Sequence, residues 1–275
     1  MQTSCKPIAC NTLQRARGRA RLVVNGDDLQ VMYQSGSSKI FLPRTHTADI
    51  EAVLVNTAGG LADGDEFTHE IDLSGDAYVT ATTQTAERVY RAASHDNARL
   101  NIKLTAKDTS RLHWLPQETI LFDNARLSRT INIDLDPNGS LLMLEMAVFG
   151  RTAMGETLTS GYFNDQWRIH RDGRLIHAEA VLLDGDIGQK LATPAAGGGH
   201  ISMGTLIYLA GDAEAYQTMT REHFAAYADL QIAVSAWQQK LVIRAVASDH
   251  ARLKAAFNSF LTTFRQAPVP RVWHL

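Results

Sequence analysis

The chain has 275 residues, 45% hydrophobic and 20% charged, a composition typical of a folded globular protein. Its 27 basic and 29 acidic residues give a formal charge of -2, so no strong overall field would draw it onto nucleic acid or an anionic membrane. The two cysteines, Cys5 and Cys10, both lie close to the N-terminus, which excludes a disulfide-stapled core and a four-ligand structural zinc site. This cysteine usage favours a reducing, cytoplasmic compartment.

The N-terminal segment carries four arginines at positions 15–21 and no acidic residue before Asp27. Such a pattern superficially resembles a transit peptide, but the alternation favours a polar tail that leads into an amphipathic strand. Further along, the longest apolar stretch covers residues 141–149 and is interrupted by Glu145. It is far shorter than the roughly 20 residues that a membrane span needs, so we expect no membrane-spanning segment.

Alternation of apolar and polar residues dominates the first 210 positions, as in half-buried β-strands. Turn-forming pairs such as Asn25-Gly26 separate the runs, and Asp172-Gly173 fits a two-residue hairpin turn. The predicted strands cover residues 19–25, 50–57, 78–85, 100–106, 130–135, 141–149, 162–171 and 174–183. Strands and helices do not alternate, so we expect no parallel nucleotide-binding sheet.

Helical periodicity is confined to the C-terminal part of the chain. Apolar residues recur at spacings of three and four over residues 249–267, with Ser248 or Asp249 as the N-cap and Pro268 as the stop. A second helix is predicted over residues 212–229, and residues 194–199 form a surface loop. No internal repeat or linker divides the chain, so residues 1–275 are expected to form a single domain.

Motifs for several kinds of catalysis are missing. The chain has no G-x-x-x-x-G-K-[ST] phosphate loop, no G-x-S-x-G nucleophile turn and no H-E-x-x-H zinc motif. It is therefore not expected to hydrolyse nucleotides. His177 and Glu179 stand two apart on a predicted strand, so they point to the same side and would make half a metal site. A polar outward face of that strand explains the pair equally well.

Acidic residues in or beside apolar segments are the remaining candidates for chemistry. Ionised carboxylates are costly there unless they are paired, bound to metal or solvated. Two of them could act as general acid and base in a β-rich carbohydrate hydrolase, whereas structural ion pairs with Arg88, Arg126 or Arg151 are the alternative. These acids are Asp63, Asp65, Glu87, Glu118, Glu145, Glu156 and Glu179.

Four short sequence motifs, in the same order as in a known family, are more distinctive than the placement of acidic residues. They read NTAGGLADGD at 56–65, TTQTAERVY at 82–90, WLPQETILF at 114–122 and FGRTAMGE at 149–156, and PRVW follows at 270–273. Together they resemble the urease accessory proteins of the UreD family, called UreH in some organisms. The resemblance extends over essentially the whole chain, although the segment around Cys5 and Cys10 matches nothing in that family, so no function is attached to either cysteine.

The resemblance implies a non-enzymatic chaperone for nickel insertion into urease. It implies a mainly β fold, an elongated, distorted β-helix-like stack of strands with two α-helices near the C-terminus. The implied partners are urease apoprotein, UreF and, through UreF, the GTPase UreG, in the cytoplasm. No cofactor would be bound stably, because nickel would be in transit through an internal, water-filled passage.

A passage for a divalent cation needs oxygen ligands that offset dehydration yet bind weakly enough to release the ion. The alternative is structural: Arg151 and Glu156 would pair across a turn, and Gly59, Gly60 and Gly64 would serve a tight bend. The hypothesis assigns the passage to Asp63, Asp65, Glu87, Glu118 and Glu156, with Arg88 and Arg151 holding the carboxylates.

The C-terminal helix and tail are implied by the same resemblance to dock UreF. Exposed aromatic residues would anchor that interface, namely Phe257, Phe260, Phe264 and Trp273. Support of the fold is the rival explanation for these residues. Besides the chaperone, two other functions stay open: the carbohydrate hydrolase, and a passive scaffold that tethers the GTPase complex.

Overall fold

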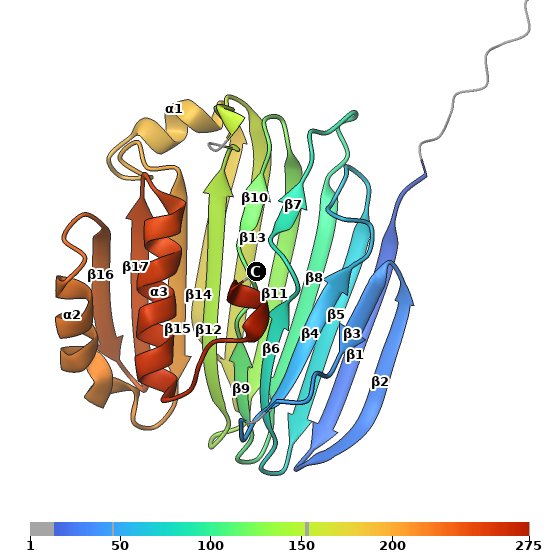
Figure 1. Ribbon diagram of the computed structural model, residues 1–275, viewed down its shortest axis with the longest axis vertical. Helices are drawn as coiled ribbons and strands as arrows, with labels where there is room; N and C mark the ends of the chain where they lie inside the picture. The colour runs from blue at the N-terminus through green and yellow to red at the C-terminus, as the bar shows by residue number, and fades with distance from the viewer. Residues whose placement is uncertain (1–13, 46, 152–153, 275) are drawn as a thin grey trace, which may run out of the picture.

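Two β-sheets stacked face to face form the body of the protein in the computed structural model, and helices cover the outer face of one sheet (Figure 1). The structure describes residues 14–45, 47–151 and 154–274. Cys5 and Cys10 lie outside these residues. Among the described residues, no helix combines the length and apolar character needed to cross a membrane.

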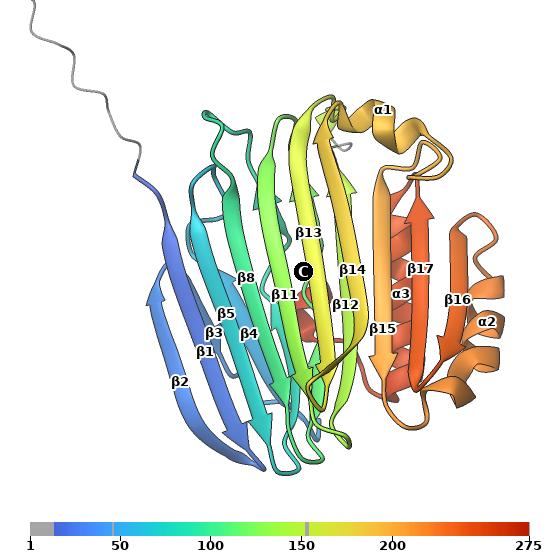
Figure 2. The same cartoon turned by 180° about the vertical axis from the view of Figure 1, so that it is seen from behind.

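Sheet A has seven strands in the order β14-β13-β11-β8-β5-β1-β2, and it faces the viewer in Figure 2. Its five central strands pair in parallel, while β2 and β14 pair antiparallel at the two edges. The strands are β1 (Arg17–Asn25), β2 (Asp28–Gly36), β5 (Glu66–Ser74), β8 (Ala98–Ala106), β11 (Arg126–Leu135), β13 (Gly161–Arg171) and β14 (Arg174–Gly185). The hairpin predicted around Asp172-Gly173 is confirmed as β13 and β14.

Sheet B has ten strands, with the main order β16-β17-β15-β12-β9-β6-β4-β3 and with β10 and β7 alongside β12. Its strands are β3 (Ser38–Phe41), β4 (Ile50–Asn56), β6 (Tyr78–Thr83), β7 (Glu87–Val89), β9 (Arg111–Trp114), β10 (Thr119–Leu121), β12 (Ser140–Phe149), β15 (Ser202–Leu209), β16 (Gln231–Trp237) and β17 (Lys240–Ala247). Sheet B extends beyond sheet A, because β15, β17 and β16 continue past the edge strand β14 (Figure 2).

From β4 to β13 the chain passes back and forth between the sheets and builds a solenoid-like stack of about 4 turns. This confirms the expected mainly β, stacked fold. Parallel pairing arises without crossover helices, because each strand returns to its own sheet one turn later. The stack needs only alternation of apolar and polar residues, so its turns carry no recognisable sequence repeat.

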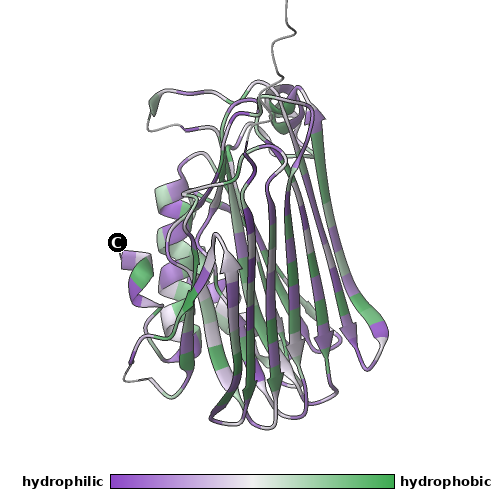
Figure 3. Ribbon diagram, turned by 90° about the vertical axis from the view of Figure 1, so that its right-hand side faces the viewer, coloured by the Kyte–Doolittle hydropathy of each residue, from purple (hydrophilic) through white to green (hydrophobic). Residues whose placement is uncertain are grey.

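Apolar and polar residues alternate along the strands (Figure 3). The apolar residues of this alternation form the core between the sheets. In β5, for example, Phe67 and Ile71 are buried between the sheets. β12 differs, because it is covered on both faces: Met143 faces sheet A, and Leu144 faces the helices. This double burial explains the near-continuous apolar run that the sequence shows at 141–149.

The arginine-rich N-terminal segment is a strand, as the amphipathic pattern predicted. Its arginines form a ladder of ion pairs with acids of the neighbouring β5 on the solvent side of sheet A. The pairs are Arg17 with Glu66, Arg19 with Glu70 and Arg21 with Asp72. Their donor–acceptor distances are 2.8, 2.9 and 3.1 Å respectively.

The helices are α1 (Ile187–Ala192), α2 (Gln217–Ala225) and α3 (His250–Arg265). α3 begins as predicted, with the Asp249 carboxylate accepting from the backbone of Ala251. The helix predicted over 212–229 is shorter, because Asp212 accepts from the Tyr208 hydroxyl instead of capping and the first turn is a 3₁₀ helix at Ala213–Tyr216. α1, with buried apolar residues only at Ile187 and Leu191, was not anticipated.

The C-terminal aromatic residues are buried, which corrects the expectation that they are exposed. Phe257 and Phe260 are 0% exposed and Trp273 is 5% exposed, whereas Phe264 is partly buried. They pack with Leu142 and Leu144 of β12 and with α2 in a second core on the outer face of sheet B. The spacing of apolar residues in the sequence predicts that one face of the helix is apolar. It does not predict whether that face packs on the protein's own sheet or is exposed to a partner.

Trp273→Ala is expected to lower the free energy of unfolding by about 3–5 kcal/mol, because it empties a buried site. The Trp273 indole also donates to Thr82 Oγ1 and the Leu115 carbonyl, both at 3.2 Å. Urea unfolding would measure the loss. Trp237→Ala is the matched control, since Trp237 is 38% exposed. Equal losses in the two variants would show that the tail does not support the fold.

Candidate functional site

The glycine-rich loop between β4 and β5 is held by its own acids. Asp63 pairs with Arg15 at 2.9 Å and also accepts from Ser94 and the Ala93 backbone. Burial would raise the pKa of Asp63, but these hydrogen bonds and the Arg15 charge hold it below its usual value. Asp65 accepts from the backbone of Ala16 and Ala62 at 2.7 and 2.8 Å.

Gly59 and Gly60 make a tight bend in this loop, as the structural alternative proposed. Their φ angles are +78° and +158°. A Cβ on Gly60 would lie 2.5 Å from the Tyr90 ring and 2.6 Å from the Arg88 carbonyl. Gly64 also has a positive φ, +80°. The bend therefore depends on residues without side chains.

Two of the proposed passage acids have structural partners elsewhere. Glu118 pairs with Lys254 of α3 at 2.9 Å and lies 3.6 Å from His250 Nε2. Although burial would raise its pKa, the contacts with His250 and Lys254 lower the pKa of Glu118 to about 2. Glu156 pairs with Arg151 at 2.8 Å across a turn. In the described part of the chain, Arg88 forms no ion pair with any of the five acids.

Glu87 differs from these acids, because it faces the space between the sheets. It lines a cavity of about 20 Å³ with His69, Thr83 and Gln84, room for one water molecule. Burial raises the pKa of Glu87 to about 7, although a hydrogen bond from Asn56, at 3.1 Å, has the opposite effect and lowers it. Burial also lowers the pKa of His69 to about 4.

A buried ion-pair network lies next along the interior. Arg129 of β11 reaches across the sheets to Glu145 of β12 at 2.5 Å and holds Asp165 of β13 at 2.6 Å. Trp114 donates to Glu145 at 2.7 Å, and Trp167 donates to Asp165 at 3.0 Å. Two carboxylates therefore share one guanidinium. Burial raises the pKa of Glu145, although the Arg129 charge opposes this shift.

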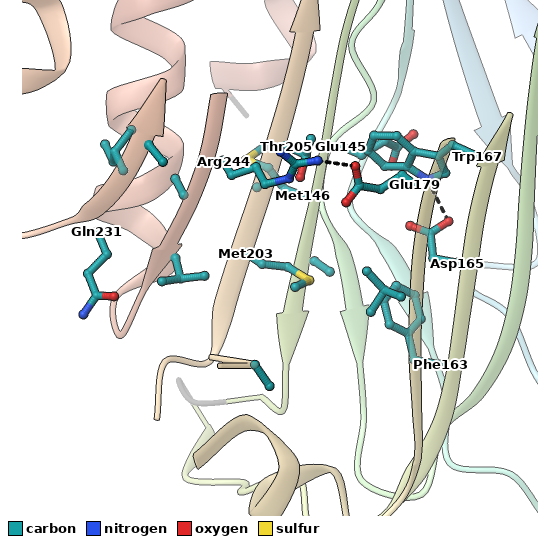
Figure 4. A pocket seen from close by; sticks show the side chains of 18 of the residues that line it. Glu145, Met146, Phe163, Asp165, Trp167, Glu179, Met203, Thr205, Gln231 and Arg244 are labelled. Carbon is teal, nitrogen blue, oxygen red and sulfur yellow. Dashed lines mark hydrogen bonds and ion pairs between the residues drawn. The ribbon is translucent and has the colours of Figure 1, made fainter. Parts of the chain in front are cut away.

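A larger cavity of about 390 Å³ continues from this network toward β14 and β16 (Figure 4). Glu145 and Asp165 line its inner part, and Glu179 of β14 lines it nearer the surface. Arg244 of β17 reaches across to Glu179 Oε2 at 2.6 Å, and its side chain is 49% exposed. The cavity therefore joins the buried carboxylates to a partly exposed ion pair.

Strand register aligns these groups into one polar row. Glu87 stands opposite Thr119, whose hydroxyl accepts from Arg129 at 3.3 Å. Glu145 stands opposite Thr205 of β15, which in turn stands opposite Arg244. We use the term polar row for the interior groups Glu87, Thr119, Arg129, Glu145, Asp165 and Glu179.

The polar row overlaps only partly with the residues proposed from sequence. Of the five proposed acids it contains Glu87, with Asp65 close enough to raise the Glu87 pKa. Glu145 and Glu179 were noted as acids near apolar strands but not assigned to the site. Arg129 and Asp165 were missed, although Asp165 sits at an inward position of its strand between the buried Phe163 and Trp167.

The row offers oxygen ligands without a closed metal cage. In the described residues, no three or more His, Cys, Asp or Glu side chains are grouped to hold a metal ion.

Comparison with known proteins decides the family. The family model described as UreD urease accessory protein matches residues 15–274. The chain belongs to the UreD family. One relative, urease accessory protein UreD of Agrobacterium fabrum, is 40% identical over 267 residues, covering 95% of this chain and 92% of that protein. UreD of Bradyrhizobium diazoefficiens is 44% identical over 263 residues, covering 94% of each chain.

Membership of the UreD family confirms the resemblance noted in the sequence. A third relative, UreD 3 of a Bradyrhizobium strain, is 43% identical and covers 94% of both chains. The similarity therefore spans both sheets, the polar row and α3.

Proposed function

We propose that this chain is a non-catalytic chaperone of urease maturation that passes Ni²⁺ to the urease apoprotein. Membership of the UreD family and the printed names of its relatives support the role in urease maturation. We further propose that it acts in the cytoplasm in a complex with UreF and, through UreF, the GTPase UreG. Nickel is cargo in this proposal and not a resident cofactor.

The polar row is the single observation that carries the nickel part of the proposal. Carboxylates inside an apolar protein cost free energy, so a row of them calls for an explanation. A hydrated divalent cation that moves between the sheets needs oxygen ligands at intervals, each weak enough to release it. Glu87 and Glu179 supply such ligands in two cavities. The oxygens of Glu145 and Asp165 already accept from Arg129 and from two indoles, so these acids shape the row and do not serve as free ligands.

The other sequence candidates take different places in the proposal. Asp63 and Asp65 hold the glycine-rich loop between β4 and β5 in shape, and Asp65 lies near Glu87. Glu118 and Glu156 act through their partners, fixing α3 and the turn after β12. We propose that UreF contacts the exposed side of α3, because the aromatic residues Phe257 and Phe260 of this helix are buried.

The hydrolase alternative is disfavoured by the geometry of the carboxylates. Arg129 binds both Glu145 and Asp165, so neither is free to act as general base. A passive scaffold stays the competing proposal, because it needs the same partners but no interior ligands.

Reconstitution from purified components tests the proposal. Urease apoprotein, UreF and UreG with GTP and limiting Ni²⁺ should give active urease only when this chain is included. Equal activation without the chain would contradict the proposal.

A further inference from the structure

Two cations meet where the turn between β13 and β14 comes close to the turn between β16 and β17, at the lower end of the molecule in Figure 2. Arg171, the last residue of β13, donates from Nη1 to the side chain of Gln239 at 2.6 Å. Lys240, the first residue of β17, donates from Nζ to the backbone carbonyl of Ile176 in β14 at 2.7 Å. Two hairpins that are distant in sequence therefore bring their cations to one place.

Neither cation is paired with any acid that the structure describes. The Nε and Nη2 atoms of Arg171 are buried and have no hydrogen-bond partner among the described residues. Lys240 is only 5% exposed, and burial lowers the pKa of both groups. Glu214, an acid that contacts the same turn, accepts from the backbone amide of Gln239 at 3.0 Å instead. A buried charge without a counter-charge costs free energy, so the arrangement calls for an anionic group from outside the chain.

The backbone of the turn holds these groups in position. Gln238 and Gln239 form the two-residue turn between β16 and β17, with φ angles of +49° and +60°. Glycine and asparagine are the usual residues in such a turn, so two glutamines adopt it at some cost. The Gln239 side chain in turn fixes Arg171. A site that is already ordered loses less conformational entropy when it binds.

Apolar side chains beside the two cations favour a protein partner over a free anion. Trp237 is 38% exposed, and the centre of its ring lies 4.8 Å from Lys240 Nζ. Leu175 is 54% exposed and stands opposite His170, the residue before Arg171. Arginine and tryptophan are enriched among the residues that dominate protein interfaces. An acidic segment with an apolar neighbour would cover all these groups, whereas a small anion would leave the apolar ones exposed.

We infer that Arg171 and Lys240 bind an acidic side chain of the urease apoprotein, with Trp237 and Leu175 packed against the apolar residues beside that acid. The inference rests on the proposed function, which supplies two partners. UreF is placed there on the exposed side of α3, over the outer face of sheet B. The site around Arg171 lies at the ends of strands from both sheets, so it is left for the second partner.

Calorimetric titration of the full-length chain with purified urease apoprotein, without nickel, tests the inference. Arg171→Leu and Lys240→Met should each weaken binding by about tenfold or more, because each removes a charge that the partner's acid neutralises. The matched control is Arg174→Leu, which removes the same charge from an exposed position opposite Arg171 in the hairpin. It should change the affinity by less than about threefold.

Unfolding of the free chain in urea separates binding from structural support. Arg171→Leu should leave the urea midpoint unchanged or raise it, because the substitution removes a buried charge that has no counter-charge. A lower midpoint would show that Arg171 supports the fold and would overturn the inference.

Three binding results would also overturn the inference. The first is equal affinity of Arg171→Leu and the unmodified chain for urease apoprotein. The second is a loss of UreF binding in place of urease binding. The third is binding of inorganic phosphate to the unmodified chain but not to Arg171→Leu, with urease binding unchanged, which would make this a site for a small anion.

Failure of the inference can be told from failure of the proposed function, because these measurements contain no nickel and no assay of activation. Normal urease binding by Arg171→Leu, while reconstituted activation still requires this chain, would remove only the inferred contact. Binding that depends on Arg171, with activation independent of the chain, would remove only the proposed function.

Discussion

Glu87→Gln is expected to lower nickel-dependent urease activation by about tenfold or more, while the complex with UreF, UreG and urease still assembles. The amide keeps the shape of the side chain and can still accept from Asn56, which lies 3.1 Å from Glu87 Oε1. It removes only the negative charge that a cation needs at this end of the polar row. Activation at limiting Ni²⁺ and co-purification of the partners would measure the two effects.

The same substitution should not destabilise the fold, which separates a transfer role from a structural one. Burial raises the pKa of Glu87 to about 7, so its ionisation costs stability above the unfolded pKa near 4.5. Glu87→Gln should therefore match the unmodified chain below about pH 4.5 and exceed it by about 1–3 kcal/mol near pH 8. Urea unfolding at the two pH values would test this.

The control is Glu156→Gln, whose side chain pairs with Arg151 in a partly exposed turn. It should leave activation within about twofold, since one exposed ion pair contributes little. If Glu87→Gln activates urease as well as this control does, the polar row does not carry nickel.

Arg129→Leu is expected to lower the free energy of unfolding at pH 7 by about 3–5 kcal/mol. The guanidinium is the shared counter-charge of Glu145 and Asp165 in the buried network. Its removal leaves two carboxylates between the sheets with only the indoles of Trp114 and Trp167 as charge-free donors. Urea unfolding followed by tryptophan fluorescence would measure the loss.

The pH dependence of this loss identifies its cause. In the variant the two carboxylates repel each other, so the native state favours protonation and the deficit should shrink toward acidic pH. Arg99→Leu is the control, because Arg99 binds Glu66 on the exposed outer face and should cost less than about 1 kcal/mol. If Arg129→Leu and Arg99→Leu lower the free energy of unfolding equally, the buried ion-pair network is not shielded from water.

Local pattern was enough to predict much of the fold. Alternation located β4, β6, β8 and β12 to within a few residues, and Asp-Gly located the turn between β13 and β14. A period and a turn signal depend on neighbours in the sequence. The pairing of strands within each sheet and the stacking of the two sheets depend on residues far apart in the sequence. The stacked architecture was therefore predicted only from the family resemblance.

The site was harder to predict because its contacts are distant in sequence. Arg129 meets Glu145 and Asp165, 16 and 36 residues away. Nothing local distinguishes Glu145 from an acid on an outward face. By contrast, Arg151 and Glu156 are five residues apart, and the turn pair was anticipated as the structural alternative.

In the proposed function, nickel reaches urease through the interior of this chain and not through bulk solvent. This route can be tested by measuring urease activation in the presence of a strong Ni²⁺ chelator that is added after the complex has been loaded. The loaded complex is expected to activate urease despite the chelator, whereas the Glu87→Gln complex is not. If the chelator abolishes activation by the unmodified complex, the ion has passed through solvent and the claim is contradicted.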